Sequence, residues 1–196
     1  MKFLPIAALA LFAASPAFAG TSFLIDFEKN WDYGTAVDNT YSALGVEFVN
    51  VLGLSNDADF TYFTNAPSPL GTASAATFDA PGYSNAYLNV AGGVDGALSF
   101  YYSSPDAVVG AIKAYSGLNG TGTLLGTIDL TANTNDYSNW TAATFAFAGT
   151  AQSFDLTGSA NLVGFDNIAA VPEASTYAML LAGLGLMGLV ARRSRR

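Results

Sequence analysis

Cysteine and histidine are both absent from the 196-residue chain. Without cysteine there is no disulfide, so stability depends on a packed core or on a bound metal ion. Without histidine, catalytic triads of the Ser-His-Asp type and every histidine-based zinc or copper site are excluded. Paired carboxylates are therefore the only catalytic groups that remain in quantity.

Basic residues are also scarce. Residues 20–170 hold 14 Asp plus Glu, and Lys29 and Lys113 are their only bases, which gives this segment a formal charge of −12. A surface of this charge repels the phosphates of nucleic acids and of anionic lipids. We therefore expect no nucleic-acid partner.

The first 19 residues have the pattern of a secretory signal peptide. Lys2 is followed by an apolar run to Ala14, and Ala17-Phe18-Ala19 is a small-residue cleavage site before Gly20. The run is short and ends in Ser15-Pro16, which argues against a stable membrane helix. The sequence predicts that residues 1–19 direct export and are then removed.

The C-terminal segment has the pattern of a weak membrane anchor. The stretch from Thr176 to Ala191 carries no charge, and as a helix it would span roughly 24 Å against a hydrocarbon core of roughly 30 Å. A cluster of arginines follows it directly: Arg192, Arg193, Arg195 and Arg196. Basic residues stay on the cytoplasmic side, so the preceding domain should be held outside. The alternative is a buried C-terminal core helix.

This segment resembles the PEP-CTERM sorting signal of Gram-negative bacteria. The resemblance rests on Pro172-Glu173-Ala174-Ser175-Thr176, on the short apolar helix and on the arginine cluster. Ala174 stands where the family pattern has its second proline. The resemblance assigns residues 171–196 to a sorting signal, with Pro172, Glu173 and Ala174 as its motif.

The resemblance also implies a location and a set of partners. An exosortase-type enzyme would process the tail, which would anchor the precursor transiently at the periplasmic face of the inner membrane. The product would then reach the cell surface or the extracellular matrix. Members of this family are associated with exopolysaccharide and biofilm.

Residues 20–170 suit one all-β domain. Apolar residues alternate with period two in short runs such as Phe23 to Phe27 and Leu98 to Tyr102. Further strands are expected at 46–51, 86–91, 108–116, 124–130, 145–147, 154–156 and 162–168, separated by Gly, Asn, Asp, Ser and Pro. The Pro-, Ser- and Asn-rich residues 56–84 are expected to form a long loop. About ten strands at this spacing predict an antiparallel β-sandwich, specifically a jelly roll.

Carboxylates occur in both terminal strands of this predicted sandwich. Asp26 and Glu28 follow Ile25, and Asp166 follows Phe165, so pairing of the two strands would bring the acids together. Crowded carboxylates repel each other unless a cation lies among them, and calcium prefers such oxygen ligands.

The Phe-Glu near the start and the Asp-Asn-Ile near the end resemble the jelly-roll carbohydrate-binding modules. That resemblance implies one structural calcium ion with Glu28 and Asp166 among its ligands. The alternative is that both residues are solvated acids on edge strands.

Aromatic residues are the other candidate functional groups. If several stand on one exposed face, they could stack on sugar rings, because an aromatic ring offers a large apolar area with a polar handle. The candidates are Trp31, Tyr33, Tyr101, Tyr102, Tyr137 and Trp140. Packing within the core is the alternative for most of them. Tyr101 and Tyr102 point to opposite faces of one strand, so at most one faces the core.

Three functions stay open on the sequence. The first is a non-catalytic surface or matrix protein that is associated with exopolysaccharide. The second is a carboxylate-based hydrolase or lyase acting on glycans, which requires two acids facing each other across a cleft. The third is an adhesion module that binds other proteins.

Overall fold

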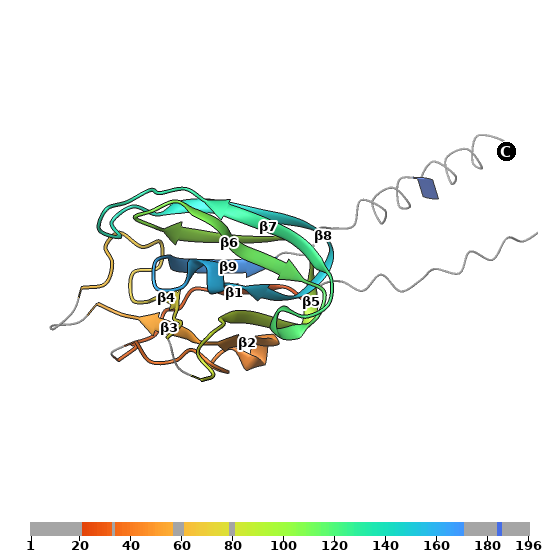
Figure 1. Cartoon of the computed structure of the whole chain (residues 1–196), viewed down its shortest axis with the longest axis horizontal. Coiled ribbons are helices and arrows are strands. Elements are labelled where there is room, and N and C mark those ends of the chain that lie inside the picture. The colour runs from red at the N-terminus through yellow and green to blue at the C-terminus, as the bar shows by residue number, and fades with distance from the viewer. Residues whose placement is uncertain (1–20, 33, 57–60, 79–80, 171–183, 186–196) are drawn as a thin grey trace, which may run out of the picture.

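The computed structural model describes residues 21–32, 34–56, 61–78, 81–170 and 184–185. Within these residues the chain forms one antiparallel nine-stranded sheet and three short 3-10 turns (Figure 1). The strands are β1 (Phe23–Ile25), β2 (Val46–Val49), β3 (Val51–Leu54), β4 (Thr72–Ala75), β5 (Tyr87–Ser103), β6 (Val108–Tyr115), β7 (Leu124–Leu130), β8 (Thr141–Asp155) and β9 (Gly164–Ala170). No helix in the described part of the chain is long and apolar enough to cross a membrane.

Two long strands, β5 and β8, pair along most of their length and bend together. The first part of β5 pairs with β2, and the last part of β8 pairs with β6, which continues to β7. The last part of β5 pairs instead with β9, which continues to β4 and β3 and also holds β1. The bent ribbon thus passes from one layer to the other and makes the sheet a sandwich.

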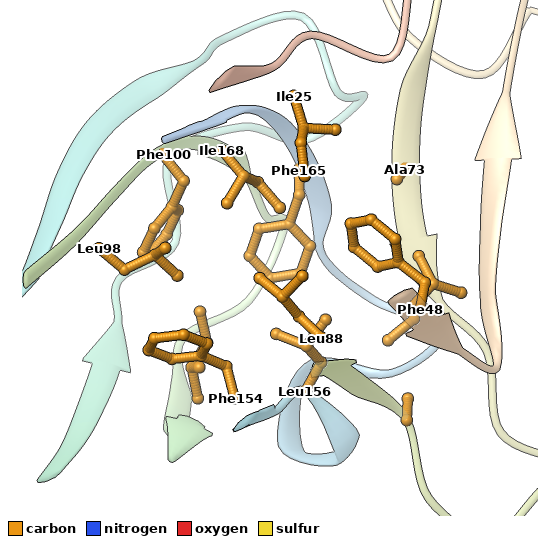
Figure 2. Packing of buried hydrophobic residues seen from close by; sticks show 14 of the residues in the cluster. Ile25, Phe48, Ala73, Leu88, Leu98, Phe100, Phe154, Leu156, Phe165 and Ile168 are labelled. Atoms are coloured by element: carbon orange, nitrogen blue, oxygen red, sulfur yellow. The ribbon is translucent and has the colours of Figure 1, made fainter. Parts of the chain in front are cut away.

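Side chains from both layers fill the space between them. Figure 2 shows Leu88 of β5, Phe154 of β8 and Phe165 of β9 in one cluster of buried residues, and each is at most 1% exposed. Phe48 of β2 and Ile25 of β1 join the same cluster. Among the described residues, all strands and all members of this core lie between Phe23 and Ala170, so this segment has a core of its own.

The prediction of an antiparallel all-β domain is confirmed, with nine strands in place of about ten. The expected strand at 46–51 is in fact two strands, because Asn50 adopts a left-handed φ of 52° and breaks the alternation. The loop expected at 56–84 contains β4, whose small residues Thr72 to Ala75 gave little strand signal. The last strand begins at Gly164 rather than at residue 162.

The first strand also ends earlier than the alternation indicated. It stops at Ile25, and Phe27 has a left-handed φ of 51°, yet the Phe27 side chain is completely buried as expected. The predicted pairing of the two terminal strands is confirmed, with Phe23 opposite Ala170 and Ile25 opposite Ile168. The predicted signal peptide at 1–19 lies outside the described residues. So does the predicted membrane helix, except for Leu184 and Gly185, which are helical and exposed.

Candidate functional site

A cleft of about 250 Å³ lies on the face of β3, β4 and β9 that points away from the core. Its floor includes Leu52 and Leu54 of β3, whose neighbours Val51 and Gly53 face the core. This strand is therefore apolar on both faces. Gly164 opens the floor at the start of β9, where a side chain would press against the ring of Trp140.

The walls of this cleft are rich in aromatic rings. They are contributed by three connecting segments, and the rings are Tyr62, Phe63, Phe78, Tyr137 and Trp140. None of the described lining residues is charged. An uncharged, ring-lined hollow suits the apolar faces of a sugar or a comparable neutral group.

The polar atoms of two rings are already engaged with the backbone. Trp140 donates its indole N–H to the carbonyl of Thr64 at 3.0 Å, and the Tyr137 hydroxyl donates to the carbonyl of Leu162 at 2.7 Å. A tyrosine hydroxyl is protonated at neutral pH, and burial raises the pKa of Tyr137 further. Both rings are thus fixed in orientation before any ligand arrives.

The segment that carries Tyr62 and Phe63 is fixed as well. The Asn56 side chain accepts hydrogen bonds from both backbone N–H groups, at 2.8 and 3.2 Å, and donates to the Phe63 carbonyl. Phe63 is 4% exposed and packs edge-on against Trp140, with ring centroids 6.2 Å apart. Phe63 and Trp140 therefore form one packed pair within the wall.

A second feature, the acidic cluster of Asp26, Glu28 and Asp166, lies close to the cleft. Asp166 is completely buried on β9, only two residues from Gly164 of the cleft floor. Its two oxygens accept backbone hydrogen bonds from Ser68 and Asn167, at 2.8 and 2.7 Å. Glu28 is exposed.

The three acids influence one another electrostatically. Burial raises the pKa of Asp166 to about 7; the two backbone N–H bonds oppose the rise, and the charges of Glu28 and Asp26 add to it. Burial, followed by the charge of Asp26, raises the pKa of Tyr41 to about 12. Glu28 and Asp166 also bind one short segment, since Asp166 accepts a hydrogen bond from Ser68 and Glu28 accepts from Leu70 and Gly71.

The donor set of this cluster is compatible with calcium, since all its ligating atoms are oxygens and the acids repel one another. Within the described residues, however, no three Asp or Glu side chains converge closely enough to hold a metal ion by themselves. A calcium ion at Glu28 and Asp166 would need backbone carbonyls or water for its remaining ligands.

The structure separates the aromatic candidates into cleft, core and exposed residues. Tyr137 and Trp140 line the cleft, whereas Trp31 is 1% exposed in the core and Tyr102 is buried as well. Tyr101 is exposed on the opposite face from Tyr102, as predicted. Tyr33 lies outside the described residues.

Sequence reasoning missed Tyr62, Phe63 and Phe78 as well as the apolar floor. One available signal was the run Val51-Leu52-Gly53-Leu54, which is apolar on both faces although only one face can meet the core.

These residues define an antiparallel all-β domain with an uncharged aromatic cleft beside an acidic cluster. At its C-terminal end the chain is similar to a known family: residues 170–196 match the family described as the PEP-CTERM protein-sorting motif. This motif implies an exported protein that is processed by exosortase and is anchored transiently in the membrane. The match includes Ala174 and the four terminal arginines, whose structure lies outside the described residues.

Among solved structures, the chain is similar to the K1 cleaved adhesin domain of Lys-gingipain from Porphyromonas gingivalis, with 15% identity and a TM-score of 0.49. The similarity covers 79% of this chain and all of that one. A family 6 carbohydrate-binding module matches at 11% identity and a TM-score of 0.44, over 79% and 96% of the two chains.

CBM35 from Paenibacillus barcinonensis matches at 16% identity and a TM-score of 0.39, over 66% and 94% of the two chains. These distant likenesses do not identify a ligand. Comparison with curated proteins finds no match by sequence.

Proposed function

We propose that the chain is an exported, exosortase-sorted surface or matrix protein whose jelly-roll domain is non-catalytic and binds glycan in the aromatic cleft. The observation that carries the proposal is the preformed, uncharged, ring-lined cleft on a chain with a sorting motif. A volume of about 250 Å³ lies just below the range of about 300–1,000 Å³ that is common for small-molecule sites. The cleft would therefore hold a short segment of a longer chain.

The charge of the domain favours a neutral glycan. Residues 20–170 have a formal charge of −12, and neither of their two bases, Lys29 and Lys113, lines the cleft. A polyanion such as a uronic-acid polymer would meet repulsion without any compensating ion pair. Exopolysaccharide rich in neutral sugars is the partner that this surface suits.

The enzymatic alternative has less support. It requires two carboxylates that face each other across an accessible cleft. The described residues that line the cleft include no acid, and Asp166 of the acidic cluster is completely buried and out of reach of a sugar.

We propose the acidic cluster as a structural calcium site rather than a catalytic one. Glu28 and Asp166 would supply carboxylate ligands there. Bound calcium would neutralise the repulsion among the three acids and hold the terminal strands together.

The glycan proposal is tested by affinity electrophoresis of residues 20–170 in gels that contain the host's own exopolysaccharide, a neutral β-glucan or xylan, or the anionic polymer alginate. We expect retardation by at least one neutral polymer and none by alginate. Trp140→Ala should weaken retardation at least tenfold, about 1.4 kcal/mol, because it removes one wall of the cleft. Tyr101→Ala is the matched control, because it removes an exposed ring outside the cleft.

Retardation that Trp140→Ala leaves unchanged would place the ligand elsewhere. No retardation by any polymer, together with capture of a protein from the cell surface, would favour the adhesion alternative.

A further inference from the structure

One segment of the chain connects the acidic cluster to the cleft. Residues 64–71, here called the strap, run between two groups of cleft residues. Tyr62 and Phe63 of the wall precede it, and Thr72 and Ser74 of the floor follow it. Any movement of the strap would therefore displace cleft residues at both of its ends.

The second half of the strap is held by carboxylates. Residues 67–71 have only three backbone N–H groups, because Pro67 and Pro69 have none. All three donate to the acidic cluster: Ser68 to Asp166 at 2.8 Å, and Leu70 and Gly71 to one oxygen of Glu28 at 2.7 and 3.4 Å. The oxygens of Glu28 and Asp166 therefore satisfy every backbone donor in this half of the strap.

The first half of the strap is held by the cleft wall itself. Thr64 donates its N–H to the carbonyl of Tyr137 at 3.1 Å and accepts the indole N–H of Trp140 at 3.0 Å. Asn65 donates its side-chain amide to the carbonyl of Ser138 at 3.1 Å. The strap thus links the acidic cluster at one end to the fixed ring of Trp140 at the other.

We propose that Glu28 and Asp166 are positioning residues of the cleft, which act through the strap. Their carboxylates order its backbone, and the ordered strap keeps the Phe63–Trp140 wall in its binding geometry. Without these acceptors, the cleft would have to order the strap when the ligand binds, at a cost in conformational entropy. This inference rests on the proposed glycan-binding function.

The two acids are predicted to differ in the substitution that they tolerate. Glu28 uses a single oxygen for both of its donors, so Glu28→Gln retains an acceptor for them. Asp166 uses both oxygens, one for Ser68 and one for Asn167, so Asp166→Asn must turn an amide NH₂ toward one N–H group.

The test uses residues 20–170 in EDTA, so that no calcium takes part, and compares Glu28→Ala, Glu28→Gln and Asp166→Asn with the unmutated domain. Glu47→Ala is the matched control, because it removes an exposed glutamate from β2 in the other layer. Acrylamide quenching of tryptophan fluorescence reports on the wall, since Trp31 is 1% exposed whereas Trp140 is only half-buried. Repeating each measurement on Trp140→Phe isolates any signal from Trp31.

We expect Glu28→Ala to increase quenching of Trp140 at least twofold, and to weaken retardation by the neutral polymer about tenfold, at a temperature where the domain is fully folded. Asp166→Asn should do the same, whereas Glu28→Gln and Glu47→Ala should match the unmutated domain. A lower Tm without a change in quenching or retardation would overturn the proposal and leave only a structural role. Glu28→Gln behaving like Glu28→Ala would also overturn it, because charge rather than an acceptor would then matter.

Failure of the glycan proposal is distinguishable from failure of this one. If no polymer retards the unmutated domain, the glycan function is wrong. The quenching of Trp140 then still decides whether the carboxylates hold the wall.

Discussion

At the scale of single residues, Asp166 is completely buried and interacts electrostatically with two other acids, Glu28 and Asp26. Burial is the main reason that its pKa rises to about 7, and the charges of Glu28 and Asp26 contribute in the same direction. The hydrogen bonds from Ser68 and Asn167 limit the rise but do not cancel it. Without a cation, this side chain therefore resists ionisation in the folded state.

This raised pKa predicts a pH dependence of stability. Because Asp166 binds its proton more tightly in the folded state than in the unfolded state, its contribution is fully present below pH 4 and is lost as the pH rises to about 7. The loss is at most about 4 kcal/mol. Urea unfolding of residues 20–170 in EDTA should show this fall, and Asp166→Asn should remove this component of the slope. Equal slopes in the two proteins would contradict the assignment.

Calcium should change the behaviour of the same residue. If Glu28 and Asp166 ligate calcium, a hundredfold excess over its dissociation constant stabilises the domain by about 2.7 kcal/mol. We expect Tm to rise with added calcium and to fall with EDTA, and Glu28→Gln to abolish the rise. Magnesium at the same concentration is the control. A melting curve of the unmutated domain that EDTA leaves unmoved would show that the acids serve only as hydrogen-bond acceptors.

At the scale of elements, the bend in the β5–β8 ribbon makes the two layers possible. Its register shifts lie between Asn89 and Val94 and between Asp95 and Ala97, where glycines supply left-handed backbone. Gly93 has a φ of 75°, and a Cβ there would approach the Thr150 methyl to 2.4 Å. The bend therefore depends on a residue without a side chain.

Two glycines of this region offer a matched comparison. Gly149 also has a left-handed φ, of 83°, but a Cβ there would meet nothing within 4 Å. Gly149→Ala should lower the free energy of unfolding by about 1 kcal/mol, because only backbone strain is added. Gly93→Ala also introduces the close contact with Thr150, so it should lower the free energy of unfolding by roughly 2–4 kcal/mol. Urea unfolding of both variants measures the difference. Equal losses of unfolding free energy in the two variants would mean that the ribbon relaxes around the methyl group added at residue 93.

At the scale of the whole molecule, the two ends of the domain lie together and away from the cleft. Phe23 of β1 pairs with Ala170 at the end of β9, whereas Gly164 at the start of β9 lies in the cleft floor. Six residue steps separate Gly164 from Ala170, which corresponds to roughly 20 Å of strand. The match to the sorting motif begins at residue 170, so the motif and the proposed binding cleft adjoin opposite ends of β9.

This arrangement predicts that sorting and binding are separable. Deletion of residues 172–196 should move the protein from the membrane fraction to soluble fractions, because the anchor is lost. It should leave Tm and retardation of the domain unchanged, because β9 ends before the deletion. Immunoblots of membrane, periplasm and medium measure the first effect. An unchanged distribution would count against the tail as an anchor.

Much of the fold could be predicted from the sequence, because alternation within a strand is a local signal. The alternation of Phe23, Ile25 and Phe27 indicated the first strand. In the last strand Phe165 and Ile168 stand three positions apart, and both are buried although Asn167 between them has a left-handed φ of 47°. The break at Asn50 and the short strand β4 could not be predicted, because small residues and a single left-handed residue leave little trace in hydropathy.

The candidate site was predictable only in part. Trp140 and Tyr137 were candidates by residue type, but so was Trp31, and the sequence could not separate an exposed ring from a core ring. The role of the strap could not be predicted at all. It depends on hydrogen bonds from strap residues to Glu28 and Asp166, which lie about 40 and 100 positions away in the sequence.

The sequence by itself determined the sorting motif, the acidity of the domain, the exclusion of histidine and cysteine chemistry, and the antiparallel all-β class. These properties depend on composition and on short local patterns, which folding does not alter. Only the tertiary structure decided which rings line a cleft, that Asp166 is buried beside Glu28, and that one strap connects the two. Those properties depend on contacts between distant segments, and such contacts arise only when the bent ribbon brings the two layers together.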